Sequence, residues 1–514
     1  MLNISRLPIK DKHYRWFALA ATMIGCFISV LDTTVVNIAV PKMMSAFGVD
    51  AKDAQWILTA YMLAMGVLQP TSGYLCDTFG TRRMYLLSLF IFTLGSALCS
   101  MAWSNNTMII FRIIQALGGG LIIPIGMSIL LQEFSTHERN SAMGIFGLAV
   151  AIAPAIGPTL SGYLVDYWDW RYIFTINIPI GIVGYIAGAL VLRETEITGG
   201  KKFDLSGFIC CSVALFCLLL ALSKGVDEGW DSVYILSLLY ISVATFILFI
   251  LIELQTDQPL LDLSLFKDWN FALGNIITFV CFAIMMGGMF LVPLFLENIL
   301  GNTAMQSGIL LLPAALVSTL IMLLAAKLAD RFGAKPLVIV GSLFLIESTF
   351  SLMYVNLDTS YYYIMSSQVM RGIGTGFAFM TITGLTMSNI TGANTSRASA
   401  LNSTIRQVSG SFGIAVLSTV LLNRQIHHMA HSAEEISYAS PATNKMLSYG
   451  VKLFMNSGDS LGIAHKKALV LINGIVQKQS VIFSFDDAFW VLGVFAVFMF
   501  LAALLLKTIK SKKK

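Results

Sequence analysis

The chain has 514 residues, of which 56% are hydrophobic and 12% charged, and its formal net charge is +5. Because soluble domains carry about 25% charged residues, this composition excludes a soluble globular protein and indicates a polytopic membrane protein. The apolar runs do not alternate with polar residues as barrel strands do, so we predict an all-α fold.

Fourteen apolar runs in the sequence are long enough to cross a bilayer, which requires about 20 apolar residues. The expected spans are residues 16–40, 54–75, 84–103, 107–131, 141–164, 171–192, 205–223, 232–253, 270–293, 304–328, 336–356, 361–388, 398–422 and 487–507. An even number of spans places both ends of the chain on the same side of the membrane.

The charges between these runs predict the orientation. Lys and Arg are concentrated in alternate connections and at both ends of the chain, whereas the other short connections carry few. By the positive-inside rule, the basic connections and both termini lie in the cytoplasm. The long connection 423–486 then lies outside. The net charge therefore reflects orientation rather than a nucleic-acid-binding surface.

The first expected span contains a carboxylate, Asp32. An acidic side chain at the centre of a spanning helix costs roughly 2.5–3.5 kcal/mol, so such a residue is a functional candidate. The alternative is a structural ion pair with a neighbouring helix. The stretch around Asp32 is unusually polar for one face of a spanning helix, and Asn37 within it is a candidate for lining a substrate cavity.

Two short stretches at expected cytoplasmic connections resemble each other, which indicates an internal repeat. Residues 73–83 and 326–335 each combine an acid, a turn glycine and basic residues. Glycine permits a tight turn, and the acid can pair with basic groups or helix termini at that face. The residues concerned are Gly73, Asp77, Gly80, Arg82 and Arg83 in the first stretch and Asp330, Arg331 and Gly333 in the second.

The repeat predicts two related halves, an arrangement from which many transporters are built, with a substrate site between them. We expect a six-helix bundle in residues 1–200 and a two-helix insertion in 201–265. A second six-helix bundle is expected in 266–514, including the external loop 423–486.

The fourth expected span contains a second charged candidate, Arg112. A guanidinium stays charged in proteins, so it must face the bundle interior or water and find a partner. Burial alone would favour the neutral form of Asp32, whereas the approach of Arg112 would favour the ionised form. We hypothesise that a conformational change alters this balance, so that Asp32 takes a proton from one side and releases it to the other. A purely structural anchor is the alternative for Arg112. Gln115, one turn later, is a candidate for the substrate cavity.

The fifth expected span carries small residues at every fourth position, which form a stripe on one helix face. Such a stripe lets helix backbones approach closely, and proline can add a bend. Gly157 in the stripe and Pro158 beside it are candidates for a gate between the halves. Ordinary helix packing is the alternative, and the two interpretations overlap. The stripe consists of Ala149, Ala153, Gly157 and Ser161.

Two further acids and two further arginines occur in or beside expected spans of the second half. We expect Glu347 to face other helices or a cavity, and both Glu347 and Glu297 are candidates for proton or substrate binding. A position at the edge of a loop is the alternative for Glu297. Arg406 lies toward the end of its apolar run, where a side chain that extends to the membrane–water interface would account for a charged residue. Arg371 lies deeper, so we expect a buried partner.

The external loop contains a predicted amphipathic helix. Apolar residues recur at helical spacing from Leu461 to Ile475, so we expect a helix outside the bilayer that contacts either a partner protein or its own bundle. Three histidines in the same loop, His427, His428 and His431, could suggest a metal site, but a solvated surface explains them equally well.

The sequence also bears on the energy source. It contains no nucleotide-binding loop of the GxxxxGK[ST] type and no metal-ligand cluster in the spans. We therefore expect a transporter driven by an ion gradient, with no bound cofactor, rather than an enzyme.

In their order and spacing, these residues resemble the fourteen-span drug:proton antiporters of the major facilitator superfamily, the EmrB/QacA group. The stretch around Asp32 is similar to that group's own signature, and residues 73–83 are similar to the superfamily's cytoplasmic loop motif. The stretch beginning at Arg112 resembles the fourth-span motif linked to proton transfer. Gly157 and Pro158 resemble part of the fifth-span antiporter motif.

The resemblance implies a major facilitator fold with two six-helix bundles and two extra central spans in a bacterial inner membrane. It also implies proton-coupled efflux of hydrophobic compounds by alternating access, in contact with membrane lipids. The loop after residue 423 resembles that of exporters that work with an EmrA-like periplasmic adaptor and an outer-membrane channel, so both are implied partners. The alternatives are a lipid or fatty-acid exporter, an uptake symporter on the same scaffold, and a non-transporting membrane receptor.

Overall fold

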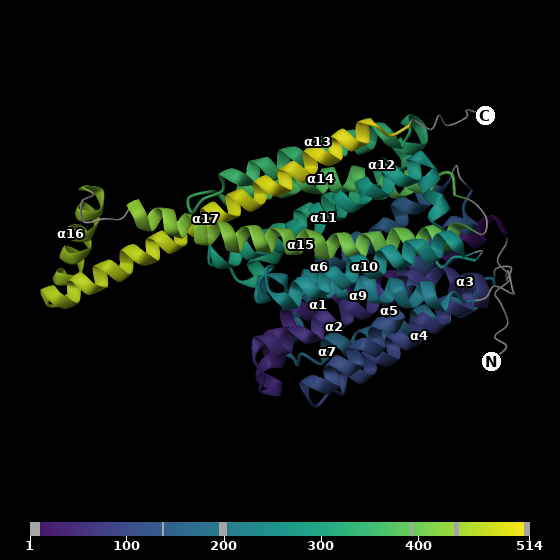
Figure 1. Ribbon diagram of the computed structural model, residues 1–514, viewed down its shortest axis with the longest axis horizontal. Coiled ribbons are helices and arrows are strands. Elements are labelled where there is room, and N and C mark those ends of the chain that lie inside the picture. The colour runs from purple at the N-terminus through teal and green to yellow at the C-terminus, as the bar shows by residue number, and fades with distance from the viewer. Residues whose placement is uncertain are drawn as a thin grey trace.

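The computed structural model describes residues 11–135, 138–194, 203–256, 258–390, 394–435 and 441–507. Within these ranges all regular secondary structure is helical, and most helices run side by side in one elongated bundle (Figure 1). The prediction of an all-α polytopic fold is therefore confirmed.

The N-terminal half is a bundle in which α1 packs on α5, α6 and α8, while α4 packs on α5 and α8. Side-chain caps fix two of the helix starts. The side chain of Asp50 accepts a hydrogen bond from the Asp53 N–H, and Ser104 with Thr107 forms a capping box. The elements are α1 (Asp11–Phe47), α2 (Ala51–Leu68), η1 (Gln69–Thr71), α3 (Ser72–Phe79), α4 (Thr81–Ser100), α5 (Asn105–Glu133), α6 (Arg139–Tyr167), α7 (Tyr172–Thr175) and α8 (Asn177–Val191).

The C-terminal half has a corresponding bundle in which α14 packs on α11, α12 and α13, while α15 packs on α11 and α17. The repeat is visible at two turns, because α3 ends at Gly80 with φ +90° and α12 ends at Gly333 with φ +85°. The elements are η2 (Leu263–Lys267), α11 (Trp269–Asn298), α12 (Ala304–Phe332), α13 (Ala334–Ser351), η3 (Leu352–Tyr354), α14 (Tyr361–Thr386), α15 (Asn394–Glu435), α16 (Pro441–Asn456) and α17 (Leu461–Leu504).

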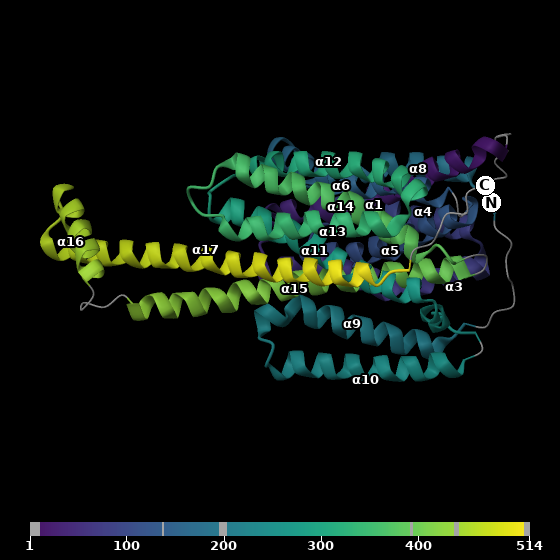
Figure 2. The ribbon, with the colours of Figure 1, turned by 90° about the horizontal axis from the view of Figure 1, so that it is seen from above.

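Two helices between the halves, α9 (Leu205–Glu228) and α10 (Val233–Gln255), form an antiparallel pair beside the bundle (Figure 2). They pack on each other, and α9 also contacts α2 and α15. The pair therefore lies along one side of the seam between the two halves. On the other side of the seam, α6 packs directly on α12.

Twelve helices in the described ranges are long and apolar enough to cross a membrane. The remaining two expected spans fall on α2 with α3, and on α14, which do not meet that criterion. The turn η1, which contains Pro70, interrupts the first of these runs, and many buried residues of α14 are Ser, Gln, Gly or Thr. The structure thus supports twelve of the fourteen expected spans on length and hydropathy.

The last helices extend well beyond the bundle (Figures 1 and 2). The extension lies at the end opposite to the beginning of α1 and the end of α17. Helix α17 has 44 residues, which corresponds to roughly 66 Å, whereas the hydrocarbon core of a bilayer is about 30 Å thick. A bilayer around the bundle would therefore leave a large part of α17 outside.

The predicted helix from residue 461 onward is present, but it is the beginning of α17 rather than a separate element. Its expected apolar stripe divides between two faces. Ala464 and Ala468 are fully buried, and Ala468 belongs to a cluster with Leu447 of α16, whereas Leu461 and Leu471 are exposed. Part of the stripe thus packs within the extension, and part of it faces outward.

The histidines of this region do not form a metal site. Among the described residues, no group of three or more His, Cys, Asp or Glu could hold a metal ion. Instead, Nε2 of His428 lies 2.8 Å from a carboxylate oxygen of Asp487, which also accepts a hydrogen bond from Arg424 at 2.6 Å. These contacts join α15 to α17 at the base of the extension.

Candidate functional site

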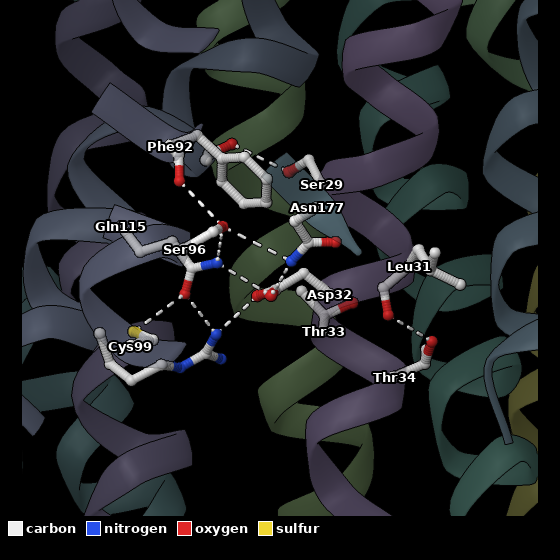
Figure 3. A network of polar contacts seen from close by, with 12 residues as sticks. Ser29, Leu31, Asp32, Thr33, Thr34, Phe92, Ser96, Cys99, Gln115 and Asn177 are labelled. Carbon is white, nitrogen blue, oxygen red and sulfur yellow. Dashed lines mark hydrogen bonds and ion pairs between the residues drawn. The ribbon is translucent and has the colours of Figure 1, made fainter. Parts of the chain in front are cut away.

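Asp32 lies at the centre of a buried polar network in the N-terminal half (Figure 3). Only 1% of its surface is exposed. Its Oδ2 accepts a hydrogen bond of 2.6 Å from Arg112 Nη1, and its Oδ1 accepts bonds of 2.9 Å from both Gln115 Nε2 and Asn177 Nδ2. An ionised carboxylate only accepts hydrogen bonds, so three donors match its charged form.

Arg112 is as deeply buried as its partner. Its guanidinium also donates to Oε1 of Gln115 at 2.7 Å and lies 3.8 Å from the centre of the Tyr61 ring, so α2 and α5 both hold it in place. The expectation that Arg112 has a buried partner is met by Asp32. The pair is a fully desolvated ion pair, in which the loss of either charge would leave the other uncompensated.

Close helix contacts hold the network together. A Cβ at Gly118 of α5 would lie 2.3 Å from the carbonyl oxygen of Ser88 in α4, so only glycine allows these backbones to approach as they do. Gly95 of α4 faces the backbone of Gln115 in the same way. The close packing of α4 on α5 brings the hydroxyl of Ser96 within 2.7 Å of Gln115 Nε2.

Two members of the network, Asn177 and Ser96, were not among the residues expected from the sequence. Asn177 is the first residue of α8 and is 1% exposed. A neutral polar residue at the end of an apolar run carries little energetic penalty, so only its position opposite Asp32 distinguishes it. The sequence alone therefore offered no signal that would have identified Asn177.

The first loop motif connects the halves at the end of the bundle where α1 begins. Asp77 is buried, and its Oδ2 lies 3.5 Å from Arg397 Nε on α15. A Cβ at Gly73 would lie 3.0 Å from the Arg397 Cα, so this glycine permits close approach of α3 to α15. Nearby, Glu194 accepts a hydrogen bond from the Arg82 N–H, and its Oε2 lies 3.4 Å from Arg83 Nε.

The second loop motif, at the end of α12 in the C-terminal half, makes the corresponding contact with α6 of the N-terminal half. The Oδ2 of Asp330 accepts a hydrogen bond of 3.0 Å from Ser141 on α6. Arg139, also on α6, donates to the carbonyl oxygens of Met387 and Ile390 in the C-terminal half. Arg331 is exposed and lies near its neighbour Phe332. Both copies of the motif therefore hold the halves together at this end of the bundle.

The stripe on α6 packs against α1 beside Asp32. A Cβ at Gly157 would lie 2.3 Å from Oγ1 of Thr34, and Ser161 donates a hydrogen bond of 2.7 Å to the carbonyl oxygen of Val35. Pro158 lies in the same helix, but its side chain is outside the described part. Elsewhere on α6, Gly144 faces Ala326 of α12. Helix α6 thus contacts both the helix that carries Asp32 and the opposite half.

Three of the expected site residues lie apart from this network. Glu347 is exposed on α13, so the expectation that it faces other helices was wrong. The helix buries its Leu, Gly and Ser residues against α14 and α17 and turns Glu347 away from them. Glu297 is exposed near the end of α11, and Asn37 is exposed on α1. No described hydrogen bond joins these three to Asp32.

Of the two arginines of the second half, Arg406 differs from expectation, whereas Arg371 has the buried partner expected for it, since Gln368 is 2% exposed. Arg406 does not extend to an interface, because it is only 6% exposed and its guanidinium lies 6.0 Å from the Phe379 ring centre. Arg371 contacts only neutral acceptors in the described chain, donating hydrogen bonds of 3.3 Å to Gln368 and to the carbonyl oxygen of Met285.

Comparison with known proteins agrees with the fold and the motifs. Residues 22–414 match the family model described as the Major Facilitator Superfamily. The chain is 34% identical over 496 residues to the uncharacterized MFS-type transporter YhcA of Bacillus subtilis strain 168, and the alignment covers 96% of this chain and 93% of YhcA. It is 28% identical over 478 residues to the multidrug export protein EmrB of Haemophilus influenzae, covering 91% of each chain.

Among solved structures, the human organic anion transporter MFSD10 aligns with a TM-score of 0.60 over 94% of this chain and 99% of that chain, at 12% sequence identity. That likeness concerns the fold alone. The family model covers most of the chain, and the relatives match nearly its full length. The resemblance seen in the sequence motifs is therefore confirmed: this chain is an integral membrane transporter, not an enzyme, and it belongs to the Major Facilitator Superfamily.

Proposed function

We propose that this protein exports hydrophobic and amphipathic compounds in exchange for protons, with Asp32 as the proton carrier. The observation that supports this most strongly is the Asp32–Arg112 pair, a carboxylate and a guanidinium that are both 1% exposed in the interior of one half. Ionisable groups inside a membrane bundle are costly and commonly mark ion pathways. The pair offers a titratable group whose protonation changes the packing around it.

The contacts of Asp32 suggest how protonation would act on the rest of the molecule. A neutral carboxyl group no longer attracts Arg112 and can itself donate a hydrogen bond. Helix α1, which carries Asp32, packs on α6 at Gly157, and α6 packs on α12 of the other half at Gly144. We propose that this sequence of contacts transmits protonation of Asp32 to the contact between the halves.

The conformation of the structure fits one stage of such a cycle. The contacts of Asp77 with Arg397 and of Asp330 with Ser141 close the seam at the end where α1 begins. By the positive-inside rule, the basic connections support a cytoplasmic location for that end in a bacterial inner membrane. The closed end would therefore be the cytoplasmic end. The fourteen-span topology that we propose counts α2 with α3 as one span and α14 as another. Release of these contacts would open the interior to the cytoplasm.

A proton-flux measurement tests the proposed function. The purified protein is reconstituted into vesicles that contain a pH-sensitive dye and carry a pH gradient, and candidate hydrophobic compounds are then added. An antiporter should produce compound-dependent proton movement down the gradient, because each compound molecule crosses in exchange for protons. Compound transport without any proton movement would contradict the coupling, whereas co-movement of compound and protons in the same direction would indicate a symporter.

The extension supports a second proposal, a contact with an EmrA-like periplasmic adaptor that leads to an outer-membrane channel. Exposed apolar residues occur on α16 and on the first turns of α17, and a partner that covers them would remove this apolar surface from water. They include Met446, Tyr449, Leu453, Leu461, Val470 and Leu471.

Leu471→Asp tests the adaptor proposal. Leu471 is 42% exposed, so the charge should leave the fold intact but weaken an apolar contact with a partner. Export across the whole envelope should fall, while transport in vesicles without an adaptor should be unchanged. Ala468→Asp is the matched comparison, because Ala468 is buried against α16 and its replacement should impair the extension itself. If Leu471→Asp leaves whole-envelope export intact, the adaptor contact at this surface is wrong.

A further inference from the structure

Arg406 is a buried cation with no counter-charge in the described chain. It is 6% exposed, its Nη2 is buried without any hydrogen-bond partner, and no described carboxylate lies within ion-pair distance of it. This contrasts with Arg112, which has Asp32. Because a desolvated charge without a partner is strongly unfavourable, a missing partner at such a position suggests a ligand.

Arg406 lies between the halves rather than within one of them. Ser399, two helical turns earlier on the same face of α15, donates a hydrogen bond of 2.8 Å to the carbonyl oxygen of Pro124 on α5. The guanidinium of Arg406 lies 6.0 Å from the ring centre of Phe379 on α14, and this ring stacks on that of Phe282 on α11. Arg406 itself interacts electrostatically with Cys26 of α1 in the other half, so the guanidinium lies at the seam of the two halves and is bordered by an aromatic pair.

A second unsatisfied donor lies beside the first. Ser403, three residues before Arg406 on the same helix face, is 4% exposed, and its hydroxyl has no hydrogen-bond partner. The apolar neighbours continue on α11, where Met286 and Phe282 face Gly410. Two unsatisfied donors next to an aromatic and methionine surface match a ligand with an oxyanion headgroup and an apolar body.

We infer that Arg406 and Ser403 form the headgroup site for the transported compound, and that the preferred substrates are amphipathic organic anions such as carboxylates. The inference rests on the proposed export function and specifies its substrate class. The guanidinium supplies the charge-assisted hydrogen bonds, and the aromatic and methionine side chains accept the apolar body. Arg371 is not the primary headgroup site, because neutral acceptors already bind it.

The test compares two probes that share the same apolar body but differ in the charge of the headgroup, dansylaminoundecanoic acid and its methyl ester. The protein is held in lipid nanodiscs, and dansyl fluorescence is corrected with empty nanodiscs. Wild type should bind the acid at least about tenfold more tightly than the ester, since a hydrogen bond to a charged group is worth that factor or more. Equal affinity for acid and ester in the wild type would overturn the inference.

Variants test which residues produce the preference for the acid over the ester. Arg406→Gln should abolish the preference for the acid, Arg406→Lys should retain part of it, and Ser403→Ala should reduce it. Arg424→Gln is the matched control, because Arg424 is a half-exposed arginine on the same helix that is paired with Asp487 of α17 at the base of the extension. An undiminished preference in folded Arg406→Gln would refute the site.

Thermal unfolding provides an independent readout. The acid should raise the midpoint of the wild type but not that of Arg406→Gln. If Arg406→Gln fails to fold, Ser403→Ala and the wild-type difference between acid and ester decide the question. Because binding needs no gradient, an acid preference that persists while vesicles show no proton-coupled transport would reject the proposed function and leave the anion site standing.

Discussion

Asp32→Asn is expected to reduce proton-coupled export to the level of protein-free vesicles, measured on vesicles that carry the same amount of folded, inserted protein as the wild type, because the variant also leaves Arg112 without its counter-charge. Asparagine has nearly the size of aspartate, but it cannot take up or release a proton. It also removes the charge that Arg112 Nη1 contacts at 2.6 Å. If Asp32 carries the proton, the variant can no longer exchange compound for protons, and compound-dependent proton flux in vesicles should disappear.

Glu347→Gln is the matched control for this variant. It also neutralises one acid of the chain, but Glu347 is exposed on α13 and has no described hydrogen bond to the network. Export by Glu347→Gln should therefore remain near the wild-type level. Undiminished proton flux with Asp32→Asn would remove Asp32 from the mechanism, and loss of flux with Glu347→Gln alone would identify the other acid as the carrier.

Arg112→Met should destabilise the protein by about 3–5 kcal/mol, the range found when one partner of a buried ion pair is removed. Methionine fills much of the space of the arginine side chain, so the loss arises mainly from the uncompensated charge of Asp32. The measurement is the thermal unfolding midpoint in detergent, together with the yield of monodisperse protein. Transport should also be lost, because the proposed partner of the carrier is absent.

The double variant Arg112→Met with Asp32→Asn separates charge from packing. With both charges removed, no buried ion remains uncompensated, and most of the lost stability should return. Export should stay absent, since the titratable group is missing. If the double variant is as unstable as Arg112→Met alone, the cation contacts of Arg112 with Tyr61 and Gln115 matter more than its pairing with Asp32.

Residues whose presence in an apolar run is costly were predictable from the sequence. Asp32 and Arg112 are outliers of this kind, and the structure brings them together. Asn177 and Ser96 were not predictable, because neutral polar side chains occur in spanning helices at little cost. Their importance depends on which helices are neighbours, and the sequence of one chain does not specify that arrangement residue by residue.

The face on which a residue lies explains the failed expectation for Glu347, and the extent of a helix explains the difference at Leu461. The position of Glu347 near the centre of a run is visible in the sequence, but the face of α13 on which it lies depends on packing against α14 and α17. Similarly, the helical spacing from Leu461 onward correctly predicted a helix. The sequence contains no strong helix breaker between Ile475 and the last span, so the helix continues as one element, α17.

The insertion between the halves makes the transporter asymmetric toward the lipid. Helix α9 is joined to α2 by the hydrogen bond from Lys224 to Gln55, and the turn that follows α9 is joined to α15 by the hydrogen bond from Trp230 to Thr419. One lateral face of the seam is thus covered by α9 and α10, while on the opposite face α6 and α12 meet directly (Figure 2). A compound dissolved in the bilayer would consequently meet two unequal sides of the seam. On one side the contact between α6 and α12 is uncovered, whereas on the other the seam is screened by two additional helices.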